Sequence, residues 1–296
     1  MGFVEVVQKL PQILGALCEA KRQVLEHRPD VLVLVDYPGM NLRMAQFAKS
    51  QGIRVVYYIL PKVWAWKSGR AWKLRDYCDD LLSILPFETD WFKERGIAIN
   101  YVGNPLAARL SAVNNFDGNS RTVFLLPGSR SQEIKYLWPV MRAFATRWPT
   151  WHFLLVRPVD AQPLGEELPS NMQEVFGFPE EDVKARMALV CSGTATLEMA
   201  LRGVPQLVLY KAHPVSLFIA KRFVRVSYFS LPNLILNRPA VPELLQEATE
   251  PAALDASWER LLNETETHLN SLQELRARLL QHDPATTAAQ QIINRL

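Results

Sequence analysis

The stretch Asp30-Val-Leu-Val-Leu-Val-Asp36-Tyr-Pro-Gly39 indicates the fold class of this protein. Five consecutive Val and Leu residues are typical of a strand that is buried on both faces, as in a parallel sheet covered by helices. The Tyr-Pro-Gly turn ends this strand. Further apolar strands alternate with helical patterns along the chain, at 54–60, 80–85, 100–102, 122–126, 152–156, 188–191 and 206–210. The alternation predicts an α/β protein with parallel sheets.

The polar, turn-rich stretch 113–120 (VNNFDGNS) interrupts this pattern and is typical of a linker. We therefore expect two Rossmann-like domains, residues 1–112 and residues 113–296, the second ending in helices. Residues 4–27 are expected to be helical, with a break at Pro11. Two such domains would hold a ligand in the cleft beyond the carboxyl ends of their strands.

Composition excludes several classes of protein. The chain has 33 basic and 30 acidic residues, and a net charge of +3 is too small to argue for nucleic-acid binding. Cys18, Cys78 and Cys191 lie far apart without metal-ligand spacing, which argues against a zinc site or a disulfide framework and favours a reducing compartment. The sequence has no apolar run of the roughly 18 residues that span a bilayer, and its start does not resemble a signal peptide. We expect a cytoplasmic location.

The segment Phe124-Leu-Leu-Pro-Gly-Ser-Arg130, followed by Gln132-Glu133-Ile134, joins a predicted strand to a predicted helix. Gly128 allows close backbone approach to a ligand, Ser129 suits a helix cap, and Arg130 offers a planar fork to phosphate oxygens. The helix N-terminus adds free N–H groups and partial positive charge. We predict an anion site, most simply for the diphosphate of a nucleotide sugar. A capped turn with a surface arginine is the alternative.

A second segment of this kind begins at Ser192, after another short strand, and ends at Glu198. Its small residues suit a helix N-terminus with exposed N–H groups, and Glu198 suits ribose hydroxyls. A simple capping motif is the alternative. Two such loops at neighbouring strand ends fit a nucleotide better than one loop does. The predicted ligand residues of this segment are Ser192, Gly193, Thr194, Ala195, Thr196 and Glu198.

Asp36 stands at the carboxyl end of its strand, where it would face a ligand and suits the role of general base. A turn-forming aspartate before Pro-Gly is the alternative. Lys62, Trp64 and Trp66 follow the next strand, and interleaved basic and aromatic residues suit phosphorylated sugars, membrane interfaces or single-stranded nucleic acid. The alternative is an exposed face with some tryptophans, such as Trp72, in the core.

Residues 214–226 (PVSLFIAKRFVRV) predict an amphipathic helix with basic residues beside its apolar face. Such a helix suits an anionic membrane surface. Packing on the protein's own core is the commoner outcome, and we favour it.

Taken together, these segments resemble the lipid-A-disaccharide synthases, bacterial glycosyltransferases of lipopolysaccharide assembly. The resemblance covers most of the chain in order, and its combination of motifs is highly specific. It is carried by MGFVEV, PDVLVLVDYPGMNLR, YYILPKVWAWKSGR, LPFE, YVGNPL, LLPGSRSQEI, SGTATLEMAL and VSYFSLPNLI.

The resemblance implies the two-domain GT-B fold and an inverting, metal-independent transfer without a cofactor. It implies UDP-2,3-diacylglucosamine as donor and 2,3-diacylglucosamine 1-phosphate as acceptor, giving the β-1,6-linked disaccharide 1-phosphate and UDP at the cytoplasmic face of the inner membrane. Whether the protein forms a homodimer stays an open question. By resemblance, Asp36 is the base on the acceptor 6-hydroxyl and Arg130 stabilises the leaving diphosphate. Gly128, Ser129, Glu133, the Ser192–Glu198 loop and Asn233 would bind the UDP-sugar, with Lys62, Trp64 and Trp66 on the acceptor side.

Members of this family carry a further stretch before the segment that matches MGFVEV, including a Gly-Glu-x-Ser-Gly-Asp loop. We find no such loop in this sequence and expect an incomplete first domain. Residues 157–169 also depart from the family pattern. The alternative is therefore a truncated or degenerate homologue that binds UDP without turnover. Another GT-B enzyme, such as a UDP-sugar transferase or epimerase, ranks last.

Overall fold

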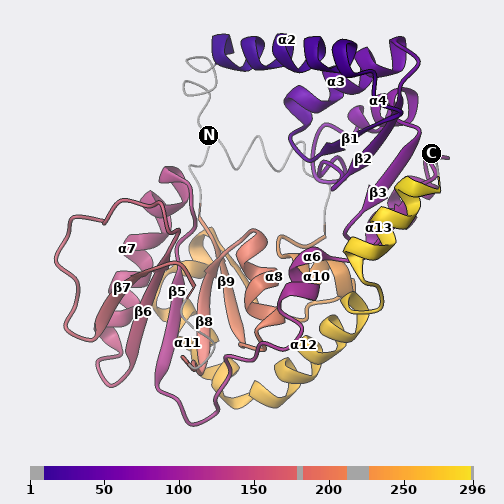
Figure 1. Cartoon of the computed structure of the whole chain (residues 1–296). Coiled ribbons are helices and arrows are strands. Elements are labelled where there is room, and N and C mark those ends of the chain that lie inside the picture. Colours follow the sequence, from indigo (N-terminus) through magenta and orange to yellow (C-terminus); the bar gives the residue numbers. More distant parts are fainter. Residues whose placement is uncertain (1–9, 179–182, 212–226, 295–296) are drawn as a thin grey trace. The chain divides into compact units, whose positions relative to one another are not determined.

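The computed structural model describes residues 10–178, 183–211 and 227–294. They form two compact units, each built on its own sheet (Figure 1). The smaller unit comprises residues 10–105 and 281–294, and the larger comprises residues 106–178, 183–211 and 227–280. All strand pairings between the described residues are parallel, which confirms the predicted α/β class.

The smaller unit has a four-stranded sheet of order β1-β2-β3-β4. Its strands are β1 (Val31–Val35), β2 (Arg54–Tyr58), β3 (Asp80–Ser83) and β4 (Asn100–Tyr101). Its helices are α2 (Leu10–His27), α3 (Pro38–Ser50), α4 (Arg70–Tyr77), α5 (Phe87–Lys93) and α13 (Pro284–Ile293). Residues of α2, α3 and α4 share one core with the sheet, while Ala288 of α13 packs with Val56 and Leu82 in another. The C-terminal helix therefore belongs to the smaller unit.

The expectation that β1 is buried on both faces is wrong. Leu34 is 6% exposed, whereas Val33 and Val35 are 37% and 50% exposed. The reason is position, because β1 is an edge strand of its sheet and the described residues leave these two side chains uncovered. An apolar run in the sequence does not distinguish an edge strand from a central one.

The larger unit has a six-stranded sheet of order β10-β9-β8-β5-β6-β7. Its strands are β5 (Thr122–Leu126), β6 (His152–Arg157), β7 (Met172–Phe176), β8 (Met187–Cys191), β9 (Gln206–Tyr210) and β10 (Glu243–Leu245). Its helices are α6 (Pro105–Arg109), which begins at the boundary between the units, α7 (Ser131–Arg147), α8 (Thr194–Leu201), α10 (Leu231–Leu236), the 3-10 helix η1 (Gln246–Thr249), α11 (Pro251–Asn263) and α12 (Thr265–Leu279).

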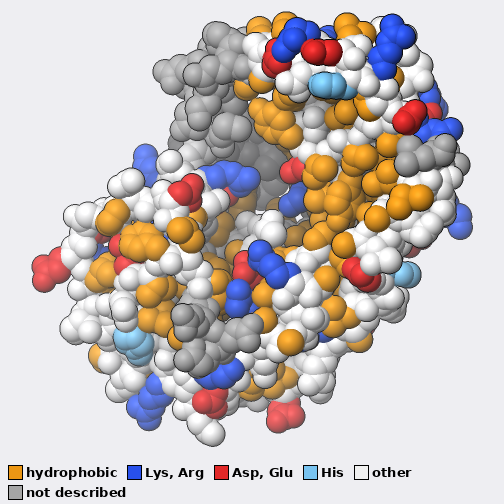
Figure 2. All heavy atoms as spheres, viewed as in Figure 1, with side chains coloured by type: hydrophobic (Ala, Val, Ile, Leu, Met, Phe, Trp, Pro, Cys, Tyr) orange, Lys and Arg blue, Asp and Glu red, His pale blue; other side chains and the backbone are white. Residues whose placement is uncertain are grey.

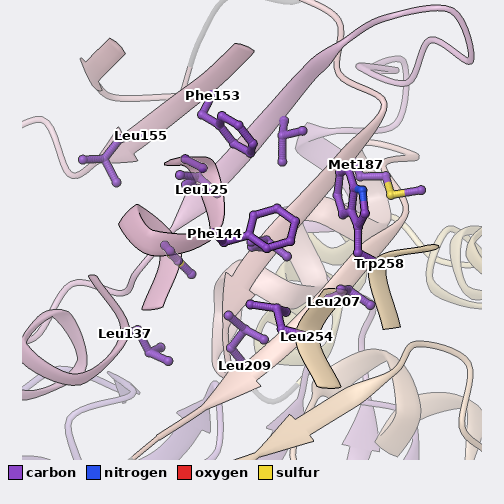
Figure 3. Packing of buried hydrophobic residues seen from close by; sticks show 14 of the residues in the cluster. Leu125, Leu137, Phe144, Phe153, Leu155, Met187, Leu207, Leu209, Leu254 and Trp258 are labelled. Atoms are coloured by element: carbon purple, nitrogen blue, oxygen red, sulfur yellow. The ribbon is translucent and has the colours of Figure 1, made fainter. Parts of the chain in front are cut away.

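The main core of the larger unit lies between its sheet and the helices α7 and α11. Figure 3 shows Phe144 of α7 and Trp258 of α11 among apolar side chains of the strands. Their ring centroids lie 5.2 Å apart at an interplanar angle of 71°, an edge-to-face arrangement that aromatic pairs favour. This core anchors the strands whose carboxyl ends carry the predicted nucleotide loops.

The structure also corrects the predicted linker at 113–120. Val113 and Asn115 are 5% and 0% exposed, and the Asn115 amide donates to the carbonyl of Val183 at 2.8 Å. Phe116 pairs with Ala185 in a parallel bridge. These residues are therefore packed into the larger unit, because their polar groups find backbone partners there. Polarity alone suggested a solvated linker.

Two strands were missed, β7 and β10, and both are at the edges of the larger sheet. The sequence of β7, MQEVF, is too polar to predict a strand, and β10 has three residues. Helix α2 is described from Leu10 onward, and within the described residues it continues through Pro11 without the expected break. The predicted amphipathic helix at 214–226 and residues 4–9 of the first predicted helix lie outside the described residues.

Across the part of the chain that the structure describes, we find no helix with both the length and the apolar character needed to cross a bilayer. Figure 2 shows basic and acidic side chains interspersed over the face in view. On that face, local positive potential depends on individual residues and not on one continuous basic patch.

Candidate functional site

The two predicted nucleotide loops lie side by side in the larger unit. They follow β5 and β8, which are paired neighbours in the sheet. A Cβ placed on Gly128 of the first loop would lie 3.2 Å from the Cys191 sulfur, at the start of the second. Because parallel strands end at the same edge of a sheet, both loops are at the edge where α/β proteins bind ligands. The expectation of neighbouring strand ends is confirmed.

Gly128 has a positive φ of 102°, a conformation that L side chains rarely adopt. A Cβ at this position would clash with the Glu133 carboxylate and would lie 2.8 Å from the Glu133 Cβ. Glycine is therefore required twice here, for the backbone conformation and for the space that Glu133 fills.

The Glu133 carboxylate occupies the N-terminus of α7, where we expected an exogenous anion. It accepts hydrogen bonds from the backbone N–H groups of Ser129 and Arg130, at 3.1 and 3.2 Å. The Arg130 guanidinium donates to its other oxygen at 2.6 Å. The protein's own carboxylate thus engages the groups that a diphosphate would use. The site is anion-binding in its chemistry, as its helix terminus and arginine require.

This arrangement shows that the expected helix cap at Ser129 is wrong. The helix cap is Arg130, and Glu133 reaches back to the N–H groups of Ser129 and Arg130. The Arg130 side chain is 68% exposed, so it has room to turn toward a ligand, while that of Glu133 is 22% exposed.

In the second loop, two of the hydroxyls are already bonded within the protein. Ser192 Oγ donates to the carbonyl of Phe229 at 2.7 Å, and Thr196 Oγ1 donates to that of Gly193 at 2.7 Å. Thr196 is 0% exposed. Thr194, at the start of α8, is exposed. Of the three hydroxyl-bearing residues of this loop, Thr194 is thus the exposed one.

Glu198 is held by Arg202, one helical turn further along the chain. Its Oε1 accepts from Arg202 Nη2 at 3.0 Å, and its side chain is 22% exposed. Arg202 is itself fixed, because it donates to Asn115 Oδ1 at 3.1 Å and lies 3.7 Å from the Phe178 ring centroid. Held in this way, Glu198 is a pre-oriented acceptor beside the second loop.

Asn233, which we expected to bind the UDP-sugar, has a buried side chain that bonds within the protein. It is 1% exposed, and its amide donates to the Val241 carbonyl and to Glu243 Oε1, both at 2.8 Å. Its Oδ1 accepts from Val241 N at 2.8 Å. Glu243 also accepts from the backbone of Phe229 and Ser230, at 2.9 Å each. Asn233 therefore holds the segment next to Ser192, and its contact with a UDP-sugar stays a prediction.

In the smaller unit, Asp36 lies exposed at the carboxyl end of β1. Asp36 and Tyr37 have positive φ values of 47° and 42°, which are strained for residues other than glycine. Asn41 Nδ2 and Tyr57 Oη donate to the Asp36 carbonyl, at 2.8 and 2.6 Å. Within the described residues the carboxylate itself has no hydrogen bond or ion pair, so the backbone is fixed while the side chain stays available.

The three predicted acceptor-side residues separate into two groups. Trp64 is 8% exposed, and its indole N–H donates to Glu88 at 2.8 Å, so it is a core residue. Trp66 is 52% exposed, with Lys67 Nζ 4.5 Å from its ring centroid, and Lys62 is exposed. Trp72, for which the alternative was a position in the core, is 44% exposed. Spacing alone did not reveal which indole had a buried acceptor.

Comparison with known proteins identifies the family. The sequence matches the model of the lipid-A-disaccharide synthetase family over residues 1–295. Lipid-A-disaccharide synthase of Coxiella burnetii is 33% identical, with 99% of this chain and 83% of the relative aligned. The enzyme of Anaeromyxobacter dehalogenans is 36% identical, over 99% of this chain and 82% of the relative.

This chain belongs to the lipid-A-disaccharide synthetase family.

Solved structures agree on the fold of this lipid-A-disaccharide synthetase family member. A glycotransferase of kitacinnamycin aligns with a TM-score of 0.66 at 18% identity, covering 97% of this chain and 81% of that one. A UDP-GlcNAc 2-epimerase from Neisseria meningitidis, bound to UDP-GlcNAc, aligns with a TM-score of 0.61 at 14% identity, over 91% of this chain and 81% of that one. The fold is GT-B. Together with its family, it makes the chain a member of the glycosyltransferases of lipid A synthesis.

The sequence did not identify three residues that hold candidate site residues within their own units. Asn41 and Glu243 fix the backbone at Asp36 and at Ser230, and Glu88 holds Trp64. Glu88 lies in the LPFE motif. A carboxylate beside apolar residues at a strand end needs a hydrogen-bond partner, so the sequence did indicate that this residue has one. Asn41 and Glu243 gave no such indication, because the fold brings their partners near: backbone carbonyls for Asn41, and backbone and side-chain donors for Glu243.

Proposed function

We propose that this chain transfers 2,3-diacylglucosamine from its UDP derivative to the 6-hydroxyl of 2,3-diacylglucosamine 1-phosphate, with inversion at the anomeric carbon. The products are the β-1,6-linked disaccharide 1-phosphate and UDP. The observation that carries this proposal is the family match over nearly the whole chain, together with two adjacent helix N-termini in the larger unit.

Asp36 is the proposed general base. It removes the proton of the acceptor 6-hydroxyl as that oxygen bonds to the anomeric carbon of the donor. An exposed carboxylate on a backbone fixed by Asn41 and Tyr57 suits this role, because its position is set while its oxygens stay accessible.

Arg130 is the proposed stabiliser of the leaving group. As the bond from the anomeric carbon to the diphosphate breaks, negative charge collects on UDP, and a guanidinium fork suits those oxygens. Arg130 pairs with Glu133 in this structure. On this proposal the diphosphate replaces the carboxylate as partner of Arg130 and of the N–H groups at the start of α7. Glu198 and Thr194 are placed to meet the nucleoside.

Both proposed substrates carry acyl chains, so the reaction requires access to a lipid surface. We propose peripheral association with the cytoplasmic face of the inner membrane. Trp66, with Lys67 and Arg70 near its ring, is an exposed aromatic and basic group of the kind found at such interfaces.

The first prediction is that purified protein releases UDP from the diacylglucosamine pair, and that Asp36→Asn and Arg130→Ala each lower kcat by about 100-fold or more. The measurement is UDP release at saturating substrates, without added metal. Asp30→Asn, at the other end of β1, and Arg142→Ala, further along α7, are matched controls with exposed side chains. Both controls are expected to keep wild-type turnover.

Full activity in Asp36→Asn would remove the general-base role, and full activity in Arg130→Ala would remove the leaving-group role. Calorimetric titration with UDP separates the alternatives for the whole chain. UDP binding without turnover on these substrates would identify a nucleotide-binding homologue and contradict the proposed reaction.

A further inference from the structure

Glu88, in the first turn of α5, is a buried carboxyl group that the proposed reaction does not use. It is 1% exposed. Its neighbours come from two segments that follow adjacent strands: Trp64 after β2, and Ser83 at the end of β3. A carboxyl is rarely buried to this extent without a specific function or partner.

Hydrogen bonding around Glu88 is consistent with a protonated carboxyl. Trp64 Nε1 donates to its Oε1 at 2.8 Å, and Ser83 Oγ contacts its Oε2. The same Ser83 hydroxyl bonds the Leu85 carbonyl at 3.0 Å and the Leu85 N–H at 3.1 Å. A hydroxyl has one hydrogen. When that hydrogen is given to Leu85, the contact with Glu88 is a hydrogen bond only if Glu88 supplies the proton.

Glu88 and its neighbour Phe87 hold the Trp64 ring from two sides. The Phe87 and Trp64 centroids are 5.0 Å apart at 80°, an edge-to-face contact, and Trp64 is 8% exposed. Trp64 is thus the buried anchor of a segment whose other predicted acceptor-side residues, Lys62 and Trp66, are exposed. The position of these two depends on the anchor between them.

We propose that Glu88 is a positioning residue for the acceptor. It acts through Trp64 to fix the segment 61–67, and the protonation state of the Glu88 carboxyl controls how firmly Trp64 is fixed. This inference rests on the proposed function for the identity of the acceptor, whereas the contact between Glu88 and Trp64 is independent of it.

The electrostatics around Glu88 support a proton that exchanges near neutral pH. Burial raises the pKa of Glu88 to about 7, while hydrogen bonds from Ser83 and Trp64, the positive charge of Lys62 and the Leu85 backbone act to lower it. Below this pKa the neutral acid bonds both neighbours. Above it Glu88 has released its proton to solvent, so its Oε2 no longer donates to Ser83, and its negative charge attracts Lys62 toward the core, away from an acceptor phosphate.

The test compares Glu88→Gln, Glu88→Ala and Trp64→Phe with the wild type. Glutamine mimics the neutral acid, since its oxygen accepts from Trp64 and its NH₂ donates to Ser83. Phenylalanine keeps a ring but loses the N–H donor. Glu94→Gln is the matched control, because Glu94 is the exposed C-cap of α5, with a side chain 72% exposed.

Glu88→Ala is expected to raise the acceptor KM about tenfold while leaving the donor KM unchanged, and Trp64→Phe to raise it severalfold in the same direction. Glu88→Gln is expected to recover most of that loss. In the wild type the acceptor KM rises with pH through about 7, and in Glu88→Gln this rise disappears. Equal changes in both KM values, or a pH profile retained in Glu88→Gln, would overturn the proposal.

A second measurement does not depend on turnover or on how well Glu88→Ala folds. The near-UV signal of Trp64, taken as wild type minus Trp64→Phe, is expected to change with pH with a midpoint near 7 and to stay constant in the Glu88→Gln background. A near-UV signal of Trp64 that does not change with pH would contradict the role of Glu88. Failure of the diacylglucosamine assay with an intact Trp64 transition would instead contradict the proposed reaction.

Discussion

At the scale of single residues, Glu133 changes how the nucleotide loop is understood. The sequence predicted an empty anion site between Gly128 and Arg130. In the structure a carboxylate from the next helical turn bonds Ser129 N, Arg130 N and the Arg130 guanidinium. A ligand phosphate must therefore offer more to these donors than Glu133 does. The second and third charges of a diphosphate provide that difference.

Gly128→Ala is predicted to destabilise the protein by about 2 kcal/mol or more, because it adds a left-handed penalty to a clash with Glu133. Urea unfolding with an unchanged m-value measures the loss. Gly165→Ala is the matched control, since Gly165 also has a positive φ, of 71°, but has no atom within 4 Å of the added Cβ. Equal losses in both variants would show that the Glu133 contact does not matter.

At the scale of elements, one carboxylate on the edge strand β10 joins several groups at the start of the short helix α10. Glu243 accepts from Ser230 N, Ser230 Oγ and Asn233 Nδ2 through Oε1, and from Phe229 N through Oε2. Phe229 in turn accepts from Ser192. The second nucleotide loop thus depends on a strand of three residues that its sequence did not reveal.

Glu243→Ala is predicted to weaken UDP binding about tenfold, because it leaves several donors near α10 without their acceptor. Isothermal titration with UDP measures the change. Glu247→Ala, an exposed glutamate of the following η1, is expected to bind UDP as the wild type does. Unchanged affinity in a folded Glu243→Ala protein would argue that UDP does not contact the second loop.

At the scale of the whole molecule, two units have separate cores, and the nucleotide loops belong to the larger one. Trp258, 0% exposed, lies at the centre of that core with Phe144 and Trp151 at centroid distances of 5.2 Å each. A ligand that binds the native larger unit stabilises that unit by mass action, by about 2.7 kcal/mol at one hundred times its Kd.

UDP is therefore predicted to raise the unfolding temperature of the larger unit. Trp258→Leu, which leaves a cavity in its core, is predicted to destabilise that unit by about 3 kcal/mol. Scanning calorimetry with and without UDP measures both effects. Trp72→Leu, at an exposed position in the smaller unit, is the control and is expected to leave the larger unit's transition in place. A UDP effect confined to the smaller unit would contradict the assignment.

The sequence predicted those features that neighbouring residues determine. Val and Leu runs, Gly and Pro turns and the spacing of strands and helices predicted the parallel α/β class, the two nucleotide loops and Asp36 at a strand end. These features depend on backbone conformation and on periodicity, which neighbouring residues determine. The family motifs added identity and the expected role of each residue.

Only the tertiary structure decided which of those residues are accessible. Trp64 and Asn233 are buried, Trp72 is exposed, Glu133 fills the loop, and β1 lies at a sheet edge with Val33 and Val35 uncovered. The burial of Trp64 depends on Glu88, a partner 24 residues away in the sequence, whereas the partners of Glu133 lie three and four residues away. Burial and hydrogen-bond partners are properties of packing between distant segments, so a local pattern does not specify them.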